Sequence, residues 1–300
     1  MALTKLDTLL EMARGKKTSR LVVAAAEDEP VLEAVRDAMK EKIIVPILVG
    51  DAPKIKEIAA KVKLSLDGIE IIDEKSPAKS SKIAVQCIRE GKGDIMMKGL
   101  VGTADLLRAV LDKENGLRKG EIISHVALHE VKGYHKLLMV TDAALTPAPT
   151  FAQKVDMIHN AAEVYHKLGI KEPKVAVLCA AETVSEKIEA SVHAAMLTTM
   201  NRRGQIKGAI VDGPLALDNA VSKEACEHKK IKSEVGGDAD ILVCPDIEAA
   251  NILYKALNFL AGATTAGVLM GAKVPIVLTS RADTDRSKLA SIALAAAMEL

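Results

Sequence analysis

Short apolar runs alternate along the chain with longer segments of helical period. Most of these runs are continuous rather than strictly alternating, which is typical of parallel strands that are covered on both faces. The runs predict strands at residues 21–26, 45–50, 69–73, 94–98, 125–131, 136–142, 174–180, 206–212, 239–245, 266–270 and 274–280.

Helices are expected in the segments between these runs. After an amphipathic N-terminal segment, they are predicted at residues 30–42, 78–90, 103–112, 151–168, 186–203, 247–260 and 283–299. In the last helix Leu289, Ile292, Ala293 and Ala296 share one face, at spacings of i, i+3, i+4 and i+7. Repeated strand–helix units predict an α/β protein with a mainly parallel sheet between layers of helices.

Two breaks in this pattern indicate a two-domain chain. The Pro-rich segment 146–150 is the first break, and Gly271–Lys273 is the second. The stretch between them holds strands and helices of its own. We therefore predict a discontinuous first domain, residues 1–140 plus 272–300, and a second domain of residues 141–271.

The composition excludes several classes of partner. The 300 residues carry a net charge of +1 and are 49% hydrophobic but only 2% aromatic, so the core must be aliphatic. A chain without a basic stripe or stacking aromatics is not expected to bind nucleic acid. The longest apolar runs, such as 292–298, are too short to span a bilayer, so no membrane partner is expected either. Cys87, Cys179, Cys226 and Cys244 form no CxxC pair and so give no metal or redox signature, and a reducing cytoplasm is expected. Cys179 and Cys244 end apolar strand-like runs and are expected to be buried thiols.

Ligands of parallel sheets bind where strands end and helices begin, and the loop after residues 94–98 has suitable chemistry there. Gly99 and Gly102 let backbone amides point at an anion, the helix that opens near Thr103 favours negative charge, and Lys98 and Arg108 add cations. The alternative is an ordinary strand–helix turn with Thr103 as N-cap and Arg108 on a solvated face. The loop matches neither a Walker A motif nor a GxGxxG fingerprint.

The second candidate loop follows the last predicted strand. Thr279, Ser280, Arg281 and Asp283 put hydroxyls, a guanidinium and a carboxylate at one strand end, which suits acyl or phosphoryl chemistry. The alternative is a capped turn with Arg281 in a surface ion pair. Because no GxSxG motif surrounds Ser280, a nucleophilic serine is not indicated.

Acidic side chains follow two later strands, and they are the candidates for a metal site. Carboxylates in pairs can bind Mg²⁺, although such residues more often cap helices and order loops. His125 and His129 would lie about 13 Å apart on one face of a strand, too far to share a metal. The acidic and amide residues concerned are Asp212, Asp218, Asn219, Asp246, Glu248 and Asn251.

These loops resemble the phosphate acyltransferase family of phosphate acetyltransferases and phosphate butyryltransferases, and the resemblance covers nearly the whole chain. The MKGLV start of the anion loop, the VDGPLALD block and the SRAD segment make it closer to the butyryltransferases. The matching segments are AEDEPVLEAVRDA (26–38), MMKGLVGTADLLRAVLDKENGLRKG (96–120), SHVALHE (124–130), RGQIKGAIVDGPLALDNAVS (203–222), PDIEAANILYK (245–255) and PIVLTSRADTDRSKLASIALA (275–295).

The resemblance implies the reaction acyl-CoA + phosphate ⇌ acyl phosphate + CoA, by direct transfer in a ternary complex. It also implies two αβα-sandwich domains of the isocitrate/isopropylmalate dehydrogenase-like type, with the active cleft between them. A homo-oligomer, dimer or higher, is expected. No permanently bound cofactor and no catalytic metal are expected, because coenzyme A is a substrate.

The resemblance also implies roles for single residues. The family's serine–arginine pair falls on Ser280 and Arg281, and its arginine after the TAD segment falls on Arg108. The acetyltransferase branch has an aspartate seven residues beyond the serine as the proposed base, and that position here is Ser287. Asp283 and Asp285 are then the nearest candidates for the base, and Asp283 is preferred because it sits at the helix entrance beside Arg281.

Two other functions stay open at this point. One is a metal- and NAD(P)-dependent decarboxylating dehydrogenase of the same fold, and the other is a non-catalytic CoA-binding module. Within the transferase reading, the physiological direction and the acyl group are also open. Butyryl, branched and acetyl groups differ by a few methylenes, and each methylene discriminates by only about 1–3 kcal/mol.

Overall fold

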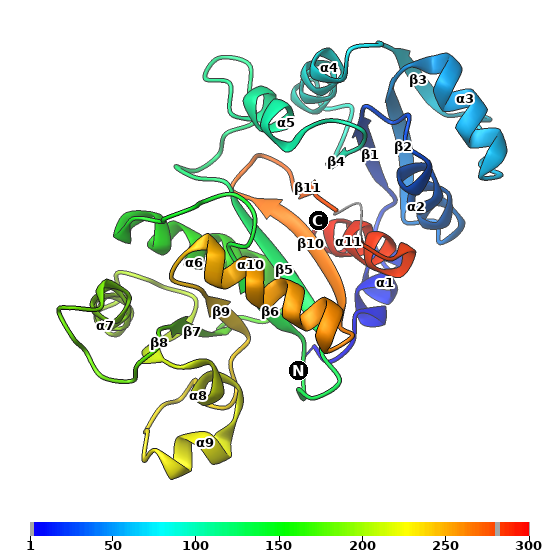
Figure 1. The fold of residues 1–300 in the computed structure, drawn as a ribbon. Helices are drawn as coiled ribbons and strands as arrows, with labels where there is room; N and C mark the ends of the chain where they lie inside the picture. The colour runs from blue at the N-terminus through cyan, green and yellow to red at the C-terminus, as the bar shows by residue number, and fades with distance from the viewer. Residues whose placement is uncertain (1–2, 280–282, 300) are drawn as a thin grey trace. The chain divides into compact units, whose positions relative to one another are not determined.

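The structure is a computed structural model that describes residues 3–279 and 283–299 (Figure 1). The chain forms two compact units. One, called the middle unit, comprises the stretch up to Lys5 together with Ser124–Thr264. The other, called the terminal unit, comprises Leu6–Ile123 and the chain from Thr265 onward. Each unit is an α/β assembly with its own run of strands.

The terminal unit has the strand order β3-β2-β1-β4-β11-β10. All neighbours are parallel except the antiparallel pair β10–β11. In register, Ala24 at the end of β1 lies opposite both Val49 of β2 and Lys98 of β4, so the carboxyl ends of these strands are level. The strands are β1 Ser19–Ala24, β2 Ile44–Gly50, β3 Glu70–Asp73, β4 Ile95–Lys98, β10 Thr264–Met270 and β11 Ile276–Val277.

The last helix is the core element of the terminal unit. It packs against α1, α2 and β11, and its residues from Ser291 to Met298 are all buried. The predicted single apolar face is therefore wrong, because a run of alanines and serines lets the helix be covered on every side. Ser291 Oγ accepts a hydrogen bond from the Gly267 amide at 2.9 Å and donates to the Ser287 carbonyl at 2.8 Å. The helices are α1 Asp7–Arg14, α2 Glu29–Lys40, α3 Ala52–Lys61, α4 Pro77–Arg89, α5 Thr103–Val110 and α11 Asp285–Met298.

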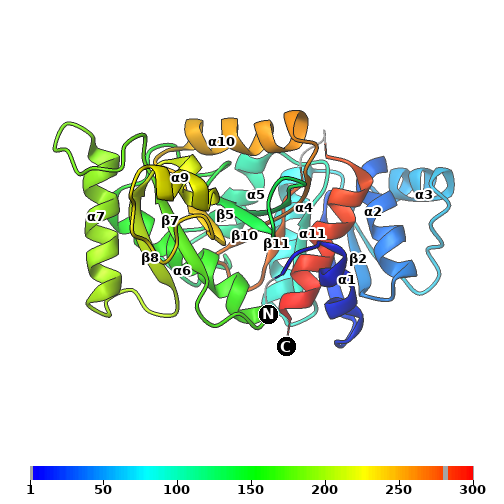
Figure 2. The same cartoon turned by 90° about the horizontal axis from the view of Figure 1, so that it is seen from below.

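The middle unit has the strand order β5-β6-β9-β7-β8. The pair β5–β6 is antiparallel and the other neighbours are parallel. Helices α6 and α10 cover opposite faces of these strands (Figure 2). The elements are β5 Ser124–Glu130, β6 Leu138–Thr141, α6 Phe151–Lys167, β7 Lys174–Leu178, α7 Glu189–Arg202, β8 Ile210–Leu215, α8 Leu217–Val221, α9 Lys223–His228, β9 Ile241–Val243, α10 Ile247–Lys255 and a π-helical turn Ala256–Leu260.

The predicted α/β class with mainly parallel strands is confirmed, and each predicted strand and helix has a counterpart. Helices α8 and α9 were not predicted, because five and six residues are too few to display a helical period. The unpredicted α3 buries only Ile55 and Ala59. The paired residues of each antiparallel hairpin lie within a single unit, β5–β6 in the middle unit and β10–β11 in the terminal unit. Apart from the change after Lys5, the chain therefore passes between units at 123/124 and 264/265, whereas the sequence predicts domain boundaries at 140/141 and 271/272.

The aliphatic core is confirmed. Among the described residues, Tyr165 is the one aromatic side chain in the buried hydrophobic set, and its hydroxyl donates to the Asp240 carbonyl at 3.0 Å. The four cysteines are buried and unpaired. Of the helices in residues 3–279 and 283–299, none has the length and apolar character needed to cross a membrane.

A charged cluster joins the amino ends of three strands of the middle unit. The buried ammonium of Lys136 lies 2.7 Å from Asp240 Oδ1 and 3.1 Å from Asp238 Oδ1. Lys174 Nζ lies 2.6 Å from Asp238 Oδ2. Burial alone would raise the pKa of Asp238, but hydrogen bonds from Lys174, His135 and Lys136 outweigh it and hold that pKa well below its ordinary value.

This cluster predicts acid sensitivity. Because the folded-state pKa of Asp238 is depressed, its contribution to stability is complete above the unfolded pKa of about 4 and is lost as the pH falls further. Asp238→Asn should reduce the free energy of unfolding by about 2 kcal/mol at neutral pH. In urea unfolding, the gap between variant and wild type should narrow toward about pH 3. The exposed Asp67→Asn is the control, and a gap independent of pH would contradict this assignment.

Candidate functional site

The level carboxyl ends of β1, β4 and β11 bring three loops to one edge of the terminal unit. The register pairs Ala24 with Lys98, and it pairs Val277 of β11 with Met97 of β4. The loops that follow β1, β4 and β11 therefore start side by side, as expected for a ligand site of a parallel sheet.

The loops after β1 and β4 are tied together by their backbones. The amides of Gly99 and Leu100 donate to the carbonyls of Ala24 and Ala25 at 2.8 and 2.7 Å. Ala25 has a left-handed φ of +55°, which costs a non-glycine residue about 1 kcal/mol and turns its carbonyl toward the neighbouring loop. A Cβ on Gly99 would lie 2.1 Å from the Ala25 oxygen, so only glycine fits this approach.

These contacts differ from those predicted for the phosphate loop. The Gly99 amide was expected to point at a ligand, but it donates to the Ala24 carbonyl at the end of β1. The Val101 amide donates to the Gly99 carbonyl at 2.9 Å. Thr103 is the first residue of α5 rather than its N-cap, which is Gly102. The first amides of α5, at Thr103 and Ala104, have no acceptor within the helix. The backbone groups that could bind an anion are therefore at the start of α5 rather than at Gly99.

A pocket of about 300 Å³ opens where the loops meet. Lys98 is half-buried at its side, and its ammonium donates to the carbonyls of Gly99 at 3.1 Å and Val101 at 3.0 Å. The residues that line this strand-end pocket are Asp28, Pro30, Val31, Lys98, Gly99, Leu100, Thr279 and Lys288. Two lysines face one aspartate, so the pocket suits an anion.

Lys288 and Asp28 were not predicted as site residues. Lys288 lies in the first turns of α11 and is only 5% exposed. A lysine near a helix N-terminus opposes the helix dipole, and that anomaly was the available sequence signal. Asp28 is the N-cap residue of α2 but its side chain makes no capping hydrogen bond, and it lines the pocket instead.

The predicted catalytic residues are only partly visible. Ser280 and Arg281 lie outside the described residues, between Thr279 and Asp283. Asp283 is partly exposed, and its carbonyl accepts a hydrogen bond from Lys288 Nζ at 2.8 Å. Asp285, the other candidate base, begins α11 with its side chain 71% exposed.

Arg108 lies in a different place from the strand-end pocket. It pairs with Asp105 one turn earlier on α5, and its side chain is 71% exposed. It lines a groove of about 720 Å³ between α4 and α5, together with Lys82 and Arg89. The structure therefore does not bring Arg108 among the residues that line the strand-end pocket.

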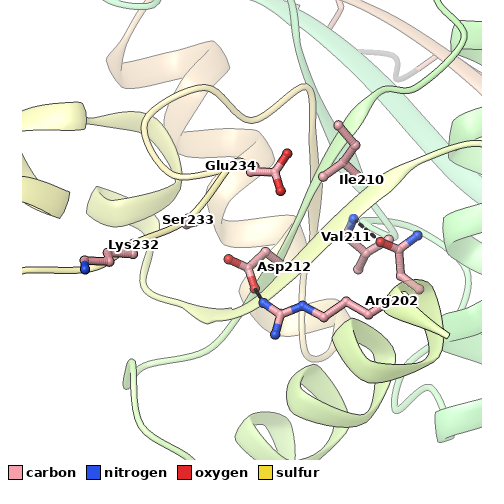
Figure 3. Close-up of a pocket in the computed structure, with 8 residues that line it drawn as sticks. Arg202, Ile210, Val211, Asp212, Lys232, Ser233 and Glu234 are labelled. Atoms are coloured by element: carbon pink, nitrogen blue, oxygen red, sulfur yellow. Dashed lines mark hydrogen bonds and ion pairs between the residues drawn. The ribbon is translucent and has the colours of Figure 1, made fainter.

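The middle unit holds a pocket of about 410 Å³ beside β8 (Figure 3). In the close-up Arg202 points to Asp212, at 3.7 Å, and Glu234 comes from the loop opposite. Asp218 pairs with Lys229 at 2.8 Å, and Asp246 caps α10 through the Ala249 amide at 2.8 Å. These carboxylates thus serve ion pairs and caps.

No metal set is found in the part of the chain that the structure describes, where no three or more His, Cys, Asp or Glu side chains are grouped to hold an ion. His125 and His129 lie in the core beside the ring of Tyr254, at centroid distances of 6.0 and 5.2 Å. Burial lowers the pKa of each histidine to about 4, so both are neutral near pH 7.

Comparison with known proteins points to one family. A model of the family described as phosphate acetyl/butaryl transferase matches residues 5–82 and 74–296. The phosphate butyryltransferase of Clostridium beijerinckii is 49% identical over 290 residues, which cover 97% of this chain and 96% of that protein. The phosphate acetyltransferase of Thermotoga maritima is 47% identical over 291 residues, with coverage of 97% and 98%.

Solved structures agree. The crystal structure of a branched-chain phosphotransacylase from Enterococcus faecalis superposes with a TM-score of 0.83 at 34% identity, and it covers 93% of this chain and 98% of that one. A 4-hydroxythreonine-4-phosphate dehydrogenase from Burkholderia phymatum is similar with a TM-score of 0.56 at 15% identity, over 94% and 99% of the chains. The second likeness is one of fold alone, of the dehydrogenase-like type.

The close approach at Gly99 predicts a large effect of one methyl group. Gly99→Ala should lower the free energy of unfolding by about 1–3 kcal/mol, because the new Cβ must push the Ala25 carbonyl away. Urea unfolding measures the loss. Gly120→Ala is the matched control, since a Cβ there meets its nearest atom only at 3.9 Å. Equal stability of both variants would show that the loops can separate without cost.

Proposed function

The chain belongs to the phosphate acetyl/butyryl transferase family, and we propose that it moves a short-chain acyl group between coenzyme A and inorganic phosphate. The reaction is acyl-CoA + phosphate ⇌ acyl phosphate + CoA, so the protein is a phosphate acyltransferase. The observation that carries this proposal is the strand-end pocket, where Lys98 and Lys288 stand at the end of the loops that match the family.

The acyl group is proposed to be butyryl or a similar short or branched group. The MKGLV, VDGPLALD and SRAD segments support this choice, because they resemble the butyryltransferase branch. Relatives named for acetyl and for butyryl groups have nearly the same identity to this chain, so a direct measurement must decide.

The transfer can be written without a covalent enzyme intermediate. The CoA thiol loses its proton, the thiolate attacks the carbonyl carbon of the acyl phosphate, and the carbon–oxygen bond to phosphate breaks. Asp283 is proposed to take the proton, and Arg281 and Lys98 to hold the phosphoryl group. Ser280 is proposed to donate to the carbonyl oxygen as it gains charge. Holding both substrates together supplies much of the lowering of the barrier.

Arg108 is proposed to act on coenzyme A rather than on the transferred phosphate. Coenzyme A carries a diphosphate and a further phosphate on its ribose, and it needs several cations along an extended surface. The α4–α5 groove offers Lys82, Arg89 and Arg108 around about 720 Å³. Arginine suits this task, since its guanidinium can hold a phosphate through two hydrogen bonds.

The expected homo-oligomer and the cytoplasmic setting stay proposals. The exposed apolar side chains of Ile252, Phe259 and Leu260, on α10 and the turn after it, support association through the middle unit. The four unpaired cysteines support a reducing compartment. Coenzyme A enters as a substrate, and no resident cofactor is proposed.

An assay of thiol release tests the reaction. Purified protein should release CoA from acyl-CoA only when phosphate is present, and EDTA should have no effect. A panel of acetyl-, butyryl- and branched acyl-CoA identifies the acyl group. Reduction of NAD(P) that EDTA abolishes would favour the decarboxylating dehydrogenase instead, and silence in both assays would favour a binding module.

Arg281→Ala tests the role that the family resemblance assigns to this residue. It should lower kcat by about a hundredfold or more and raise the KM for acyl phosphate, because a cation that holds the transferred group is lost. Arg286→Ala is the matched control, since it removes an exposed guanidinium from the first turn of α11. If Arg281→Ala turns over like wild type, the assignment is wrong.

Asp283→Asn tests the base. It should lower kcat by about a hundredfold to ten-thousandfold with little change in the KM for phosphate, because a proton acceptor is removed while charge at the phosphate is not. The pH dependence of kcat should lose its acidic limb. Asp285→Asn is the comparison, and a larger loss in that variant would transfer the role to Asp285.

A further inference from the structure

Lys288 is a buried cation that has no carboxylate closer than 3.5 Å among the described residues. Its ammonium donates to the carbonyl of Asp283 at 2.8 Å, and within the described residues its ion-pair partner is Asp285, with Oδ1 at 3.5 Å. The Asp285 side chain is 71% exposed, so water screens that charge. The Lys288 side chain itself is only 6% exposed.

The position of Lys288 in α11 makes its buried positive charge still less favourable. The helix begins at Asp285 with Thr284 as N-cap, so Lys288 stands within the first turns, where the backbone amides already present positive charge. Burying a charged group costs free energy, and the helix dipole adds to that cost for a cation. A side chain that served packing alone would therefore be expected to be an uncharged residue type here.

Another buried lysine of the chain shows how a buried ammonium is usually balanced, by nearby carboxylates. Lys136 has the same exposed fraction of its side chain, 6%, and it has Asp240 at 2.7 Å and Asp238 at 3.1 Å. Two carboxylates within hydrogen-bond distance balance that ammonium. The contrast indicates that the counter-charge of Lys288 is supplied from outside the chain.

The strand-end pocket is where such a charge would enter. Lys288 lines it together with Lys98 and Thr279, and Asp28 is the carboxylate in the lining. The ammonium of Lys98 stands at the same pocket, where it donates to the carbonyls of Gly99 at 3.1 Å and Val101 at 3.0 Å. The cavity of about 300 Å³ has room for a phosphate group.

We infer that Lys288 is the second cation of the phosphate subsite and contacts an oxygen of phosphate or of the phosphoryl group of the acyl phosphate. This inference rests on the proposed function. The Lys98 and Lys288 ammonium groups hold the dianion from the β4 and α11 sides, and the Thr279 hydroxyl is available to donate to it. Lys288 thereby selects for the doubly charged tetrahedral anion over the thioester substrate.

The test uses Lys288→Gln, because a glutamine amide can still donate to the Asp283 carbonyl while the charge is lost. The KM for phosphate should rise about tenfold to a hundredfold, the range for losing a hydrogen bond to a charged group. The KM for acyl-CoA should stay near the wild-type value. Lys288→Arg should recover part of the affinity for phosphate, since the charge returns.

Inorganic phosphate should also raise the Tm of the wild-type protein, because it binds only the folded state. At the same phosphate concentration this shift should be much smaller in Lys288→Gln, because phosphate binds that variant more weakly. Lys154→Met is the matched control, since it removes a lysine of similar burial in α6 of the middle unit. It should keep the phosphate-dependent Tm shift.

The outcomes are separable. If Lys288→Gln leaves both the KM for phosphate and the Tm shift unchanged, the inference is wrong. Lys288 then has a structural role, through its hydrogen bond to the Asp283 carbonyl. A wild-type Tm that does not respond to phosphate overturns the subsite as well. A wild type without phosphate-dependent thiol release overturns the proposed function alone, because the Tm shift reports phosphate binding independently of turnover.

Discussion

The close approach of the β1 and β4 loops is the constraint on which the candidate site depends. Hydrogen bonds from the amides of Gly99 and Leu100 to the carbonyls of Ala24 and Ala25 hold the two loops at contact distance. This contact needs the parallel register that pairs Ala24 with Lys98. It fixes Lys98 at the pocket wall and directs the chain into α5, so pocket, cation and helix start all follow from one backbone contact.

The elements of the fold could be predicted because apolar runs and helical periods are local properties of the sequence. The two candidate loops could also be predicted, since parallel strands must end at one edge of a sheet. The use of the Gly99 amide could not, because it depends on a hydrogen bond to a strand distant in sequence. The position of Arg108 depends on how α5 packs against α4, and that of Lys288 on the burial of α11 from all sides.

The near-neutral composition takes on a functional meaning once charges are located. Most ion pairs involve exposed side chains and contribute little. In the middle unit Lys136 is balanced by carboxylates, and the result is structural. In the terminal unit Lys98 and Lys288 donate to backbone carbonyls and line the strand-end pocket, which is the basis of the proposed phosphate subsite. In the proposed site, a few cations gathered at one pocket would bind the anion, so a basic surface is not needed.

The departure at Ser287 now has a physical account. The resemblance to the acetyltransferase branch implies an aspartate as base at this position, whereas Ser287 is buried here. Its hydroxyl accepts a hydrogen bond from the Thr265 amide at 3.3 Å and one from Thr284 Oγ1 at 3.1 Å, so it ties α11 to β10 and to its own N-cap. A carboxylate there would be buried against these groups. The position serves packing in this chain, which leaves Asp283 and Asp285 as the proposed candidates for the base.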